Sequence, residues 1–249
     1  MNQWRVVGAS VRGPDHERDG SPCQDAWAAG PFGAHGARLC LCDGAGSASH
    51  AEVGARVVAT AVVAALAERA AEDPPQDALR SACAAGRAAL LRTAADLELA
   101  PTALACTLIA VLCTGESVVV AHLGDGAVVG QRAGSSELVM LSAPDRGEYV
   151  NETWFITSAD WEAHLRIGVH AGVSRLCVIT DGCEAAALLR GERELPFAPF
   201  FAPLFEFTAE IADTEAAGAE VRQLLDGAAM RGSSGDDKTL VIVWREASP

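Results

Sequence analysis

Short runs of apolar and β-branched residues recur along the chain, and they predict strands. Several of these runs are uninterrupted Val, Ile, Leu and Cys, which is typical of strands covered on both faces. The predicted strands occupy residues 4–9, 38–42, 104–113, 117–122, 127–132, 137–141, 175–180 and 239–244. The consecutive runs from 104 to 141 are joined by tight Gly-containing turns, which predicts an antiparallel meander.

Helical periodicity appears between some of these strands. Ser49 and Glu52 have the spacing of a capping box, and apolar residues then recur at helical intervals as far as Leu66. Further helices are expected over residues 75–97 and 214–230, with a shorter one after Asp181. This order of elements predicts an α+β fold, in which helices cover mixed sheets, and the absence of any linker-like stretch predicts a single domain over residues 1–249.

Two stretches lack clear periodicity. Residues 142–173 form a long irregular segment, which is typical of an ordered flap over an active site. Residues 196–207 hold five of the seven phenylalanines. We interpret this second stretch as a helix or loop packed in the core, and an exposed docking patch is the alternative.

Composition narrows the classes of function. The net charge is −14, with 33 acidic and 19 basic residues, which argues against binding of nucleic acid through its phosphates. The eight cysteines lie inside apolar runs, as reduced, buried thiols do. We find neither a signal sequence nor an apolar run near the ~20 residues that cross a bilayer, so we expect a cytoplasmic protein with no membrane partner.

The positions of the aspartates indicate a metal-binding site. Asp43, Asp125 and Asp181 each follow an apolar run and precede a glycine, and Asp236 lies just before the last run. Taken singly, an Asp-Gly pair is most often a turn. Together, carboxylates gathered at one rim of the sheets would repel each other unless cations neutralised them. Oxygen ligands without nearby His or Cys favour Mg²⁺ or Mn²⁺, and a following glycine lets its carbonyl approach an ion.

Other motif interpretations are weaker. The segment from Gly44 to Ser49 imitates the G-x-G-x-x-G of dinucleotide-binding proteins, but its last glycine is missing and Asp43 would face the pyrophosphate. We retain a nucleotide-binding protein as a less favoured alternative. We find no phosphate-binding P-loop, no G-x-S-x-G elbow and no H-E-x-x-H zinc motif.

Taken in order, the short motifs resemble the metal-dependent type 2C serine/threonine protein phosphatases, in particular a bacterial branch, over nearly the whole chain. The motifs that carry this resemblance are Pro22-Cys23-Gln24-Asp25-Ala26, Asp43-Gly44-Ala45-Gly46-Ser47, Gly124-Asp125-Gly126, Gly147-Glu148-Tyr149-Val150-Asn151-Glu152-Thr153, Thr180-Asp181-Gly182 and Gly235-Asp236-Asp237-Lys238-Thr239. Each is weak alone, and their order and spacing are specific.

The resemblance implies a four-layer α-β-β-α sandwich with a two-metal centre at one edge of two mostly antiparallel sheets. Asp43 would bridge two Mg²⁺ or Mn²⁺ ions, with Gly44 offering its carbonyl. Asp181 and Asp236 would complete the shell of one ion, and Asp25 would serve the other ion directly or through water. Asp125 matches a residue that helps to hold a third, weaker ion. Residues 145–157 would correspond to the flap.

The implied activity is hydrolysis of phosphoserine or phosphothreonine in a protein by water activated between the two ions. The family's phosphate-binding arginine is replaced by Gly20, so Arg18, or Arg12, would have to reach the phosphate from a shifted loop. Many relatives also have a histidine, proposed as the acid for the leaving group, where this chain has Ala45. His16, His50 or a metal-bound water would then supply the proton.

The resemblance also suggests a kinase or the target of a kinase as the phosphorylated partner, and we expect a monomer. The missing histidine motivates one alternative from another class of function. In that alternative the chain is a catalytically weak or inactive module that keeps the fold and binds phosphoproteins or other partners.

Overall fold

The structure is a computed structural model that describes residues 3–69, 73–115, 117–145, 153–191 and 194–245. Two five-stranded sheets form its centre, and all of their strand pairs are antiparallel. In the first sheet the order is β1 (Trp4–Val11), β12 (Lys238–Arg245), β9 (Val173–Ile179), β6 (Ala127–Arg132) and β7 (Leu138–Ser142). In the second sheet the order is β2 (Ala26–Phe32), β3 (Gly36–Cys42), β4 (Leu108–Thr114), β5 (Ser117–Leu123) and β8 (Arg166–Ala171).

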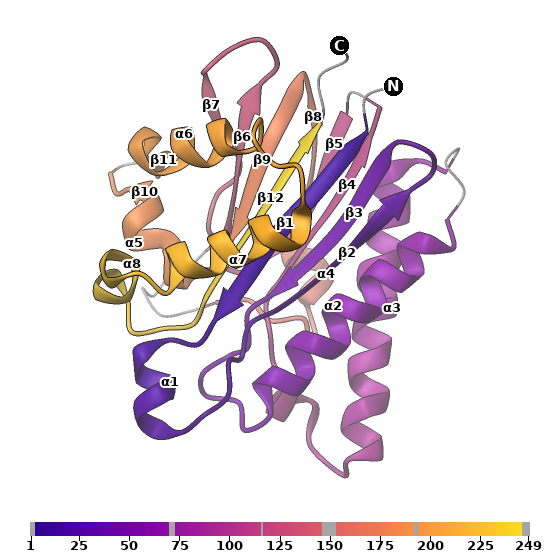
Figure 1. Cartoon of the computed structure of the whole chain (residues 1–249). Coiled ribbons are helices and arrows are strands. Elements are labelled where there is room, and N and C mark those ends of the chain that lie inside the picture. Colours follow the sequence, from indigo (N-terminus) through magenta and orange to yellow (C-terminus); the bar gives the residue numbers. More distant parts are fainter. Residues whose placement is uncertain (1–2, 70–72, 116, 146–152, 192–193, 246–249) are drawn as a thin grey trace.

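Helices cover the outer faces of both sheets (Figure 1). The long helices α2 (Ala51–Ala67) and α3 (Pro75–Asp96) pack on the second sheet. The helices on the first sheet are α5 (Glu184–Ala187), α6 (Ala198–Phe207), α7 (Thr214–Leu225) and α8 (Ala228–Ser233). The smaller elements are α1 (Pro14–Asp19), η1 (Pro101–Leu104), α4 (Trp161–His164), η2 (Asp181–Cys183), β10 (Leu188–Leu189) and β11 (Leu195–Pro196). The predicted α+β fold, a four-layer α-β-β-α sandwich, is confirmed.

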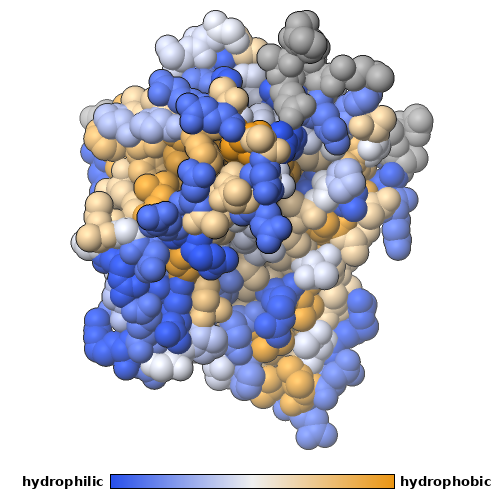
Figure 2. All heavy atoms as spheres, viewed as in Figure 1, coloured by the Kyte–Doolittle hydropathy of each residue, from blue (hydrophilic) through white to orange (hydrophobic). Residues whose placement is uncertain are grey.

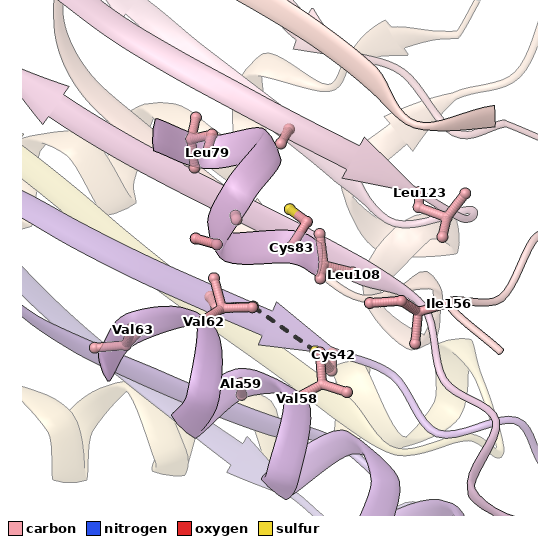
Figure 3. Packing of buried hydrophobic residues seen from close by; sticks show 14 of the residues in the cluster. Cys42, Val58, Ala59, Val62, Val63, Leu79, Cys83, Leu108, Leu123 and Ile156 are labelled. Carbon is pink, nitrogen blue, oxygen red and sulfur yellow. Dashed lines mark hydrogen bonds between the residues drawn. The ribbon is translucent and has the colours of Figure 1, made fainter. Parts of the chain in front are cut away.

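Three apolar clusters hold these layers together. One fills the space between the two sheets, a second lies between the first sheet and its helices, and a third lies between the second sheet and α2 and α3. In the third cluster Val58 and Val62 of α2 lie close to Cys42 of β3, and Leu79 and Cys83 come from α3 (Figure 3). The central strands are therefore covered on both faces, which explains why their apolar runs are uninterrupted in the sequence.

The predicted meander over residues 104–141 is wrong. β4 pairs with β5 in the second sheet, whereas β6 pairs with β7 in the first sheet. The chain therefore changes sheets between Leu123 and Ala127, and Asp125 lies at this crossing. Periodicity along a sequence cannot distinguish a turn within a sheet from a turn between stacked sheets, because both join apolar runs through Gly-containing segments.

The sequence interpretation also missed strands with weak apolar patterns. β2 contains Ala28, Ala29, Gly30 and Pro31, which are poor strand formers, and it is an edge strand where Pro is tolerated. β8 and α4 lie inside the expected flap of residues 142–173, so part of that segment is regular. Residues 146–152 of the expected flap lie outside the described residues.

Two predictions about helices need correction, and one is confirmed. The predicted capping box is wrong, because His50 is the N-cap of α2 and the Ser49 hydroxyl contacts His50 Nδ1 at 2.9 Å instead. The helix predicted over residues 214–230 is divided into α7 and α8 at Gly227. The Phe-rich stretch forms α6, whose Phe201 and Phe205 are buried, so the core-packing interpretation is confirmed.

All eight cysteines are described, and each is a free thiol. Among the described residues, we find no helix with the length and apolar character that crossing a membrane requires.

Candidate metal centre

Strand register brings Asp25 and Asp43 together. Asp25 lies immediately before β2 and Asp43 immediately after β3, and the adjoining residues Ala26 and Cys42 are paired across the two antiparallel strands. The carboxyl groups therefore leave the second sheet at the same end. Both backbone groups of Asp43 are also fixed by Thr107, whose hydroxyl accepts from Asp43 N at 3.1 Å and whose amide donates to Asp43 O at 2.8 Å.

The first sheet delivers the other aspartates to the same end. Asp181 follows β9, and Asp236 lies just before β12, whose Leu240 is paired with Ile179 of β9. Asp125 lies at the crossing between the sheets, two residues before Ala127, which is also paired with Ile179. The two sheets thus bring five aspartates, far apart in the sequence, to the same end of the structure.

The proximity of these groups affects their ionisation. Burial raises the pKa of Asp43 well above its ordinary value, and the negative charges of Asp25, Asp181, Asp236 and Asp125 raise it further. Burial, with the charges of Asp125 and Asp236, also raises the pKa of Asp181 to about 6, against the lowering effect of a hydrogen bond with Asp43. Carboxyl groups whose negative charges raise the pKa of Asp43 and Asp181 in this way are a strong attractor of cations.

One carboxyl oxygen of Asp25 accepts hydrogen bonds from hydroxyl groups, and the other has no partner in the part of the chain that the structure describes. Its Oδ2 accepts from Thr180 Oγ1 at 2.9 Å and from Thr239 Oγ1 at 2.8 Å. Burial nevertheless raises the pKa of Asp25 to about 8, with the charges of Asp237 and Asp181 acting in the same direction. Two buried oxygens, Asp25 Oδ1 and Asp181 Oδ1, have no hydrogen-bond partner among the described residues. Unpartnered buried carboxylate oxygens fit the ligand set of a hard divalent cation.

Gly44 allows a close approach of backbone to this site. A Cβ at Gly44 would lie 2.8 Å from the carbonyl oxygen of Gln24 and 2.8 Å from Ala51 Cβ. Gly44 also forms an isolated antiparallel bridge with Cys106, so its peptide groups are fixed next to Asp43. A larger residue would force the loop away from the aspartates.

Ala45 lies in a small apolar cluster with Ala48, Ala51 and Ala105, against which Phe155 packs. Its side chain is 8% exposed. The dinucleotide-binding alternative does not fit this loop, because β3 belongs to an antiparallel sheet and not to a βαβ unit.

The side chain of Arg18 is paired with Asp15 and is largely exposed. Arg18 lies on α1, is 69% exposed at its side chain, and donates to Asp15 Oδ1 at 2.7 Å. Arg12 donates to the carbonyl of Ser21 at 3.3 Å. A role of Arg18 as phosphate ligand would require its pair with Asp15 to open, so this role stays a prediction.

Several residues that hold the site were missed from the sequence. Thr180 and Thr239 lie in the motifs quoted above, and their hydroxyl groups are natural donors to a nearby buried carboxyl. Thr153 Oγ1 donates to Asp125 Oδ2 at 2.6 Å, which connects the expected flap segment to Asp125. The buried Asp237 was passed over in favour of its neighbour Asp236, and no periodicity distinguishes the two.

Comparison with known proteins agrees with this architecture. The profile of the protein phosphatase 2C family matches residues 12–226. The chain belongs to this family, and the predicted class, a protein serine/threonine phosphatase, is thereby confirmed.

Individual relatives cover almost the entire chain. Serine/threonine-protein phosphatase 3 of Escherichia coli (strain K12) is 29% identical over 254 residues, which is 98% of this chain and 99% of that protein. The catalytic domain of the serine/threonine phosphatase PstP, solved in complex with two manganese ions, has a TM-score of 0.69 at 19% identity, covering 99% of this chain and 100% of that one. The phosphatase Stp1 from Staphylococcus aureus has a TM-score of 0.66 at 15% identity, covering 99% and 96%. These two structures support the fold.

Proposed function

We propose that this protein hydrolyses phosphoserine and phosphothreonine in other proteins, in a reaction that depends on Mg²⁺ or Mn²⁺ bound at the aspartates. The observation that carries the proposal is the convergence of five aspartates at the same end of the two sheets, with buried oxygens of Asp25 and Asp181 lacking partners among the described residues. The PstP structure with two manganese ions supports the choice of metal.

The donors available suggest how two ions would be held. Asp43 would be shared by both ions, with the carbonyl of Gly44 as a further ligand. Asp181 and Asp236 would hold one ion, Asp25 would serve the other, and Asp125 would contribute to a third, weaker ion. When bound, these ions would supply positive charge for the phosphate and activate a water for attack on phosphorus.

Residues of the chain itself would orient this ligand set. The hydroxyls of Thr180 and Thr239 fix one oxygen of Asp25 and so direct the other oxygen into the site. Thr107 fixes both the backbone N–H and the backbone C=O of Asp43. Because the aspartates come from both sheets, packing between the sheets sets the distance between ligands.

Substitution of the proposed bridging ligand tests the assignment. Asp43→Asn and Asp181→Asn are expected to lower Mn²⁺-dependent hydrolysis of an aryl phosphate by at least about 10²-fold, since each removes a charged ligand. Asp96→Asn is the matched control, because Asp96 is exposed at the end of α3, outside the site. Normal activity in Asp43→Asn would show that the proposed centre is not catalytic.

Arg18 is the proposed phosphate ligand. Arg18→Ala is expected to raise KM for a phosphopeptide without a matching loss of kcat, since a guanidinium suits a phosphate dianion. Arg12→Ala is the parallel variant, because Arg12 lies at the base of the same loop. An unchanged KM in Arg18→Ala would remove Arg18 from the site.

A non-catalytic binding module is the second candidate. The observation that favours it is Ala45, which lies in an apolar cluster and offers no proton where many relatives are thought to use histidine. Calorimetry with Mn²⁺, combined with turnover of phosphopeptides, separates the two functions. Tight Mn²⁺ binding without turnover of any phosphopeptide would favour the module.

The cellular setting follows from the same reasoning. The proposed substrate is a phosphorylated protein, such as a kinase or the target of a kinase, and the proposed state is a monomer. A cytoplasmic location is supported by the eight free thiols, seven of which are buried.

A further inference from the structure

The chain has a single lysine, and this residue is buried. Lys238 is the only Lys among the 19 Lys and Arg residues, and it is 1% exposed. It therefore does not contribute to the hydrophilic surface that Figure 2 shows around α1, at the end of the first sheet where β12 begins (Figure 1). A buried charged side chain is costly unless it is well bonded, so the position of this lysine calls for a specific role.

Lys238 begins a row of side chains that is otherwise apolar. The alternate residues Leu240, Ile242 and Trp244 of β12 belong to the cluster between the first sheet and its helices. Successive side chains of a strand point to opposite faces, so Lys238 starts on this same face. An apolar side chain would suit the row equally well, and packing alone does not account for a lysine.

The ammonium group of Lys238 binds the turn that carries Asp236. Its Nζ donates to the carbonyl of Ser234 at 2.8 Å and to the carbonyl of Asp236 at 2.7 Å. Ser234 is the C-cap of α8, so the first bond also satisfies a carbonyl at the end of that helix. An ammonium is a compact donor whose N–H groups can converge on the carbonyls of one turn, which a planar guanidinium fits less well. Within the turn, Asp237 N donates to Asp236 Oδ1 at 2.8 Å, so the backbone and the carboxyl are oriented together.

The stem of Lys238 also packs against the turn that carries Asp181. A Cβ at Gly182 would lie 3.2 Å from Lys238 Cγ and would clash with the carbonyl oxygen of Asp237. The two turns can therefore lie in close contact because residue 182 is glycine. In the same turn, burial raises the pKa of Cys183, and the positive charge of Lys238 opposes this rise.

We propose that Lys238 is a positioning residue that sets the spacing between Asp181 and Asp236, the two carboxyls proposed to hold one ion. This inference rests on the metal centre of the proposed function. The ammonium holds one turn, and the stem packs against the other. Two ligands that reach an ion from separate turns bind it well only at a fixed separation, so Lys238 acts through the turns and not on the phosphate.

Two neutral substitutions separate the hydrogen bonds of Lys238 from its charge. Lys238→Gln keeps N–H donors for the turn, whereas Lys238→Met keeps a stem of similar length without a donor. Both remove the positive charge, so a difference between the two variants reports the hydrogen bonds alone. We expect the Kd for Mn²⁺ at one of the two sites, measured by calorimetry, to be at least about 10-fold larger in Lys238→Met than in Lys238→Gln. The Kd of the other site should differ by less than about 3-fold, because its ligands do not depend on these turns alone.

Further variants guard this comparison. Lys238→Leu removes the donor with the side chain that Leu240 has in the same row, and it replaces Lys238→Met if that variant does not fold. Gly182→Ala acts from the opposite turn with the lysine intact, and it should weaken Mn²⁺ binding at the same site. Arg132→Met is the matched control, because Arg132 is an exposed cation that also donates to a backbone carbonyl, that of Ala171. It should leave both Kd values unchanged.

The proposed function and the role of Lys238 have separate outcomes. Turnover of a phosphopeptide by the wild-type protein tests the proposed function, whereas the Mn²⁺ affinities do not require turnover. Mn²⁺ binding without turnover would therefore overturn the phosphatase function alone. Equal Kd values in the Met, Leu and Gln variants, equal changes at both sites, or an unchanged Kd in Gly182→Ala would overturn the positioning role. A wild-type protein that binds no Mn²⁺ would overturn both.

Discussion

Thr239, at the start of β12 in the first sheet, donates its hydroxyl hydrogen to Asp25 Oδ2, next to β2 in the second sheet, at 2.8 Å. Thr239 also lies 2.6 Å from Ser10 Oγ and donates its amide to Thr180 Oγ1 at 2.9 Å. A buried chain of hydroxyls therefore links both sheets to one carboxyl of the site. In this arrangement the relative position of the sheets and the orientation of Asp25 depend on each other.

The variant Thr239→Val tests this link. It removes the donor to Asp25 while keeping the shape of the side chain, so we expect a weaker Mn²⁺ affinity for one of the two sites, by about 10-fold. We also expect a loss of about 1–3 kcal/mol in the free energy of unfolding of the metal-free protein, because a buried carboxyl loses a partner. Calorimetry and denaturant unfolding measure the two effects.

Thr239→Ser is the control for this prediction, since it keeps the hydroxyl and should restore most of the Mn²⁺ affinity. Equal Mn²⁺ affinities in the Val, Ser and wild-type proteins would show that Asp25 is not a ligand whose orientation matters.

Because the aspartates repel each other, we expect Asp43→Asn to have opposite effects on the melting temperature with and without metal. In chelator, the substitution removes one of several negative charges that repel each other, so the melting temperature is expected to rise above that of the wild type. In Mn²⁺ the order should reverse, because only the wild type gains the full stabilisation of bound ions, about 2.7 kcal/mol at 100-fold excess over Kd.

Differential scanning calorimetry compares the melting temperatures of wild type and Asp43→Asn in chelator and in Mn²⁺. Asp96→Asn is the exposed control. A lower melting temperature for Asp43→Asn in chelator would mean that the wild-type carboxyls do not repel each other appreciably in the absence of ions.

Much of the fold and of the acidic site could be predicted because both depend on local signals. Apolar runs marked the central strands, and Asp43, Asp125 and Asp181 each follow such a run, so their positions alone predicted that they lie at the ends of strands. β2 was missed because an edge strand with Ala, Gly and Pro has no clear pattern. The sheet change at Asp125 was also missed, because stacking of sheets is a tertiary property.

The remaining features of the site depend on contacts between distant residues. The pair of His16 and Asp237 joins residues 221 positions apart, and nothing in either local sequence indicates the other. The bond from Thr239 to Asp25 spans 214 positions. Such contacts follow from the packing of the sheets, so the sequence alone left the proton donor open among His16, His50 and water.

Restoring a histidine at position 45 is expected to fail. Ala45 is 8% exposed and lies in an apolar cluster covered by Phe155, so Ala45→His would overpack this cluster. We expect a loss of about 1–3 kcal/mol in the free energy of unfolding and no gain in turnover of a phosphoserine peptide. Denaturant unfolding and peptide assays measure these effects. Ala45→Ser is the smaller control, and a clear gain in peptide turnover in Ala45→His would show that this loop can adopt a different conformation.

We expect the burial of His122 to make the protein less stable in acid. Burial lowers the pKa of His122 from 6.5 to about 3, and the positive charge of Arg166 acts in the same direction. Its Nδ1 lies 2.8 Å from Ser142 Oγ and 3.1 Å from Arg166, so the folded protein keeps the ring neutral. Between pH 6.5 and about 3 the unfolded chain therefore binds a proton that the folded chain excludes.

Because the unfolded state binds more protons over this range, the free energy of unfolding contributed by His122 is complete above pH 6.5 and decreases as the pH falls toward 3. The decrease is at most about 1.4 kcal/mol per pH unit. Other groups titrate in the same range, so the informative quantity is the difference between wild type and His122→Gln in chelator. His35→Gln, in the turn between β2 and β3, is the control. Parallel stability curves for wild type and His122→Gln would show that His122 is protonated in the folded protein, against the burial seen here.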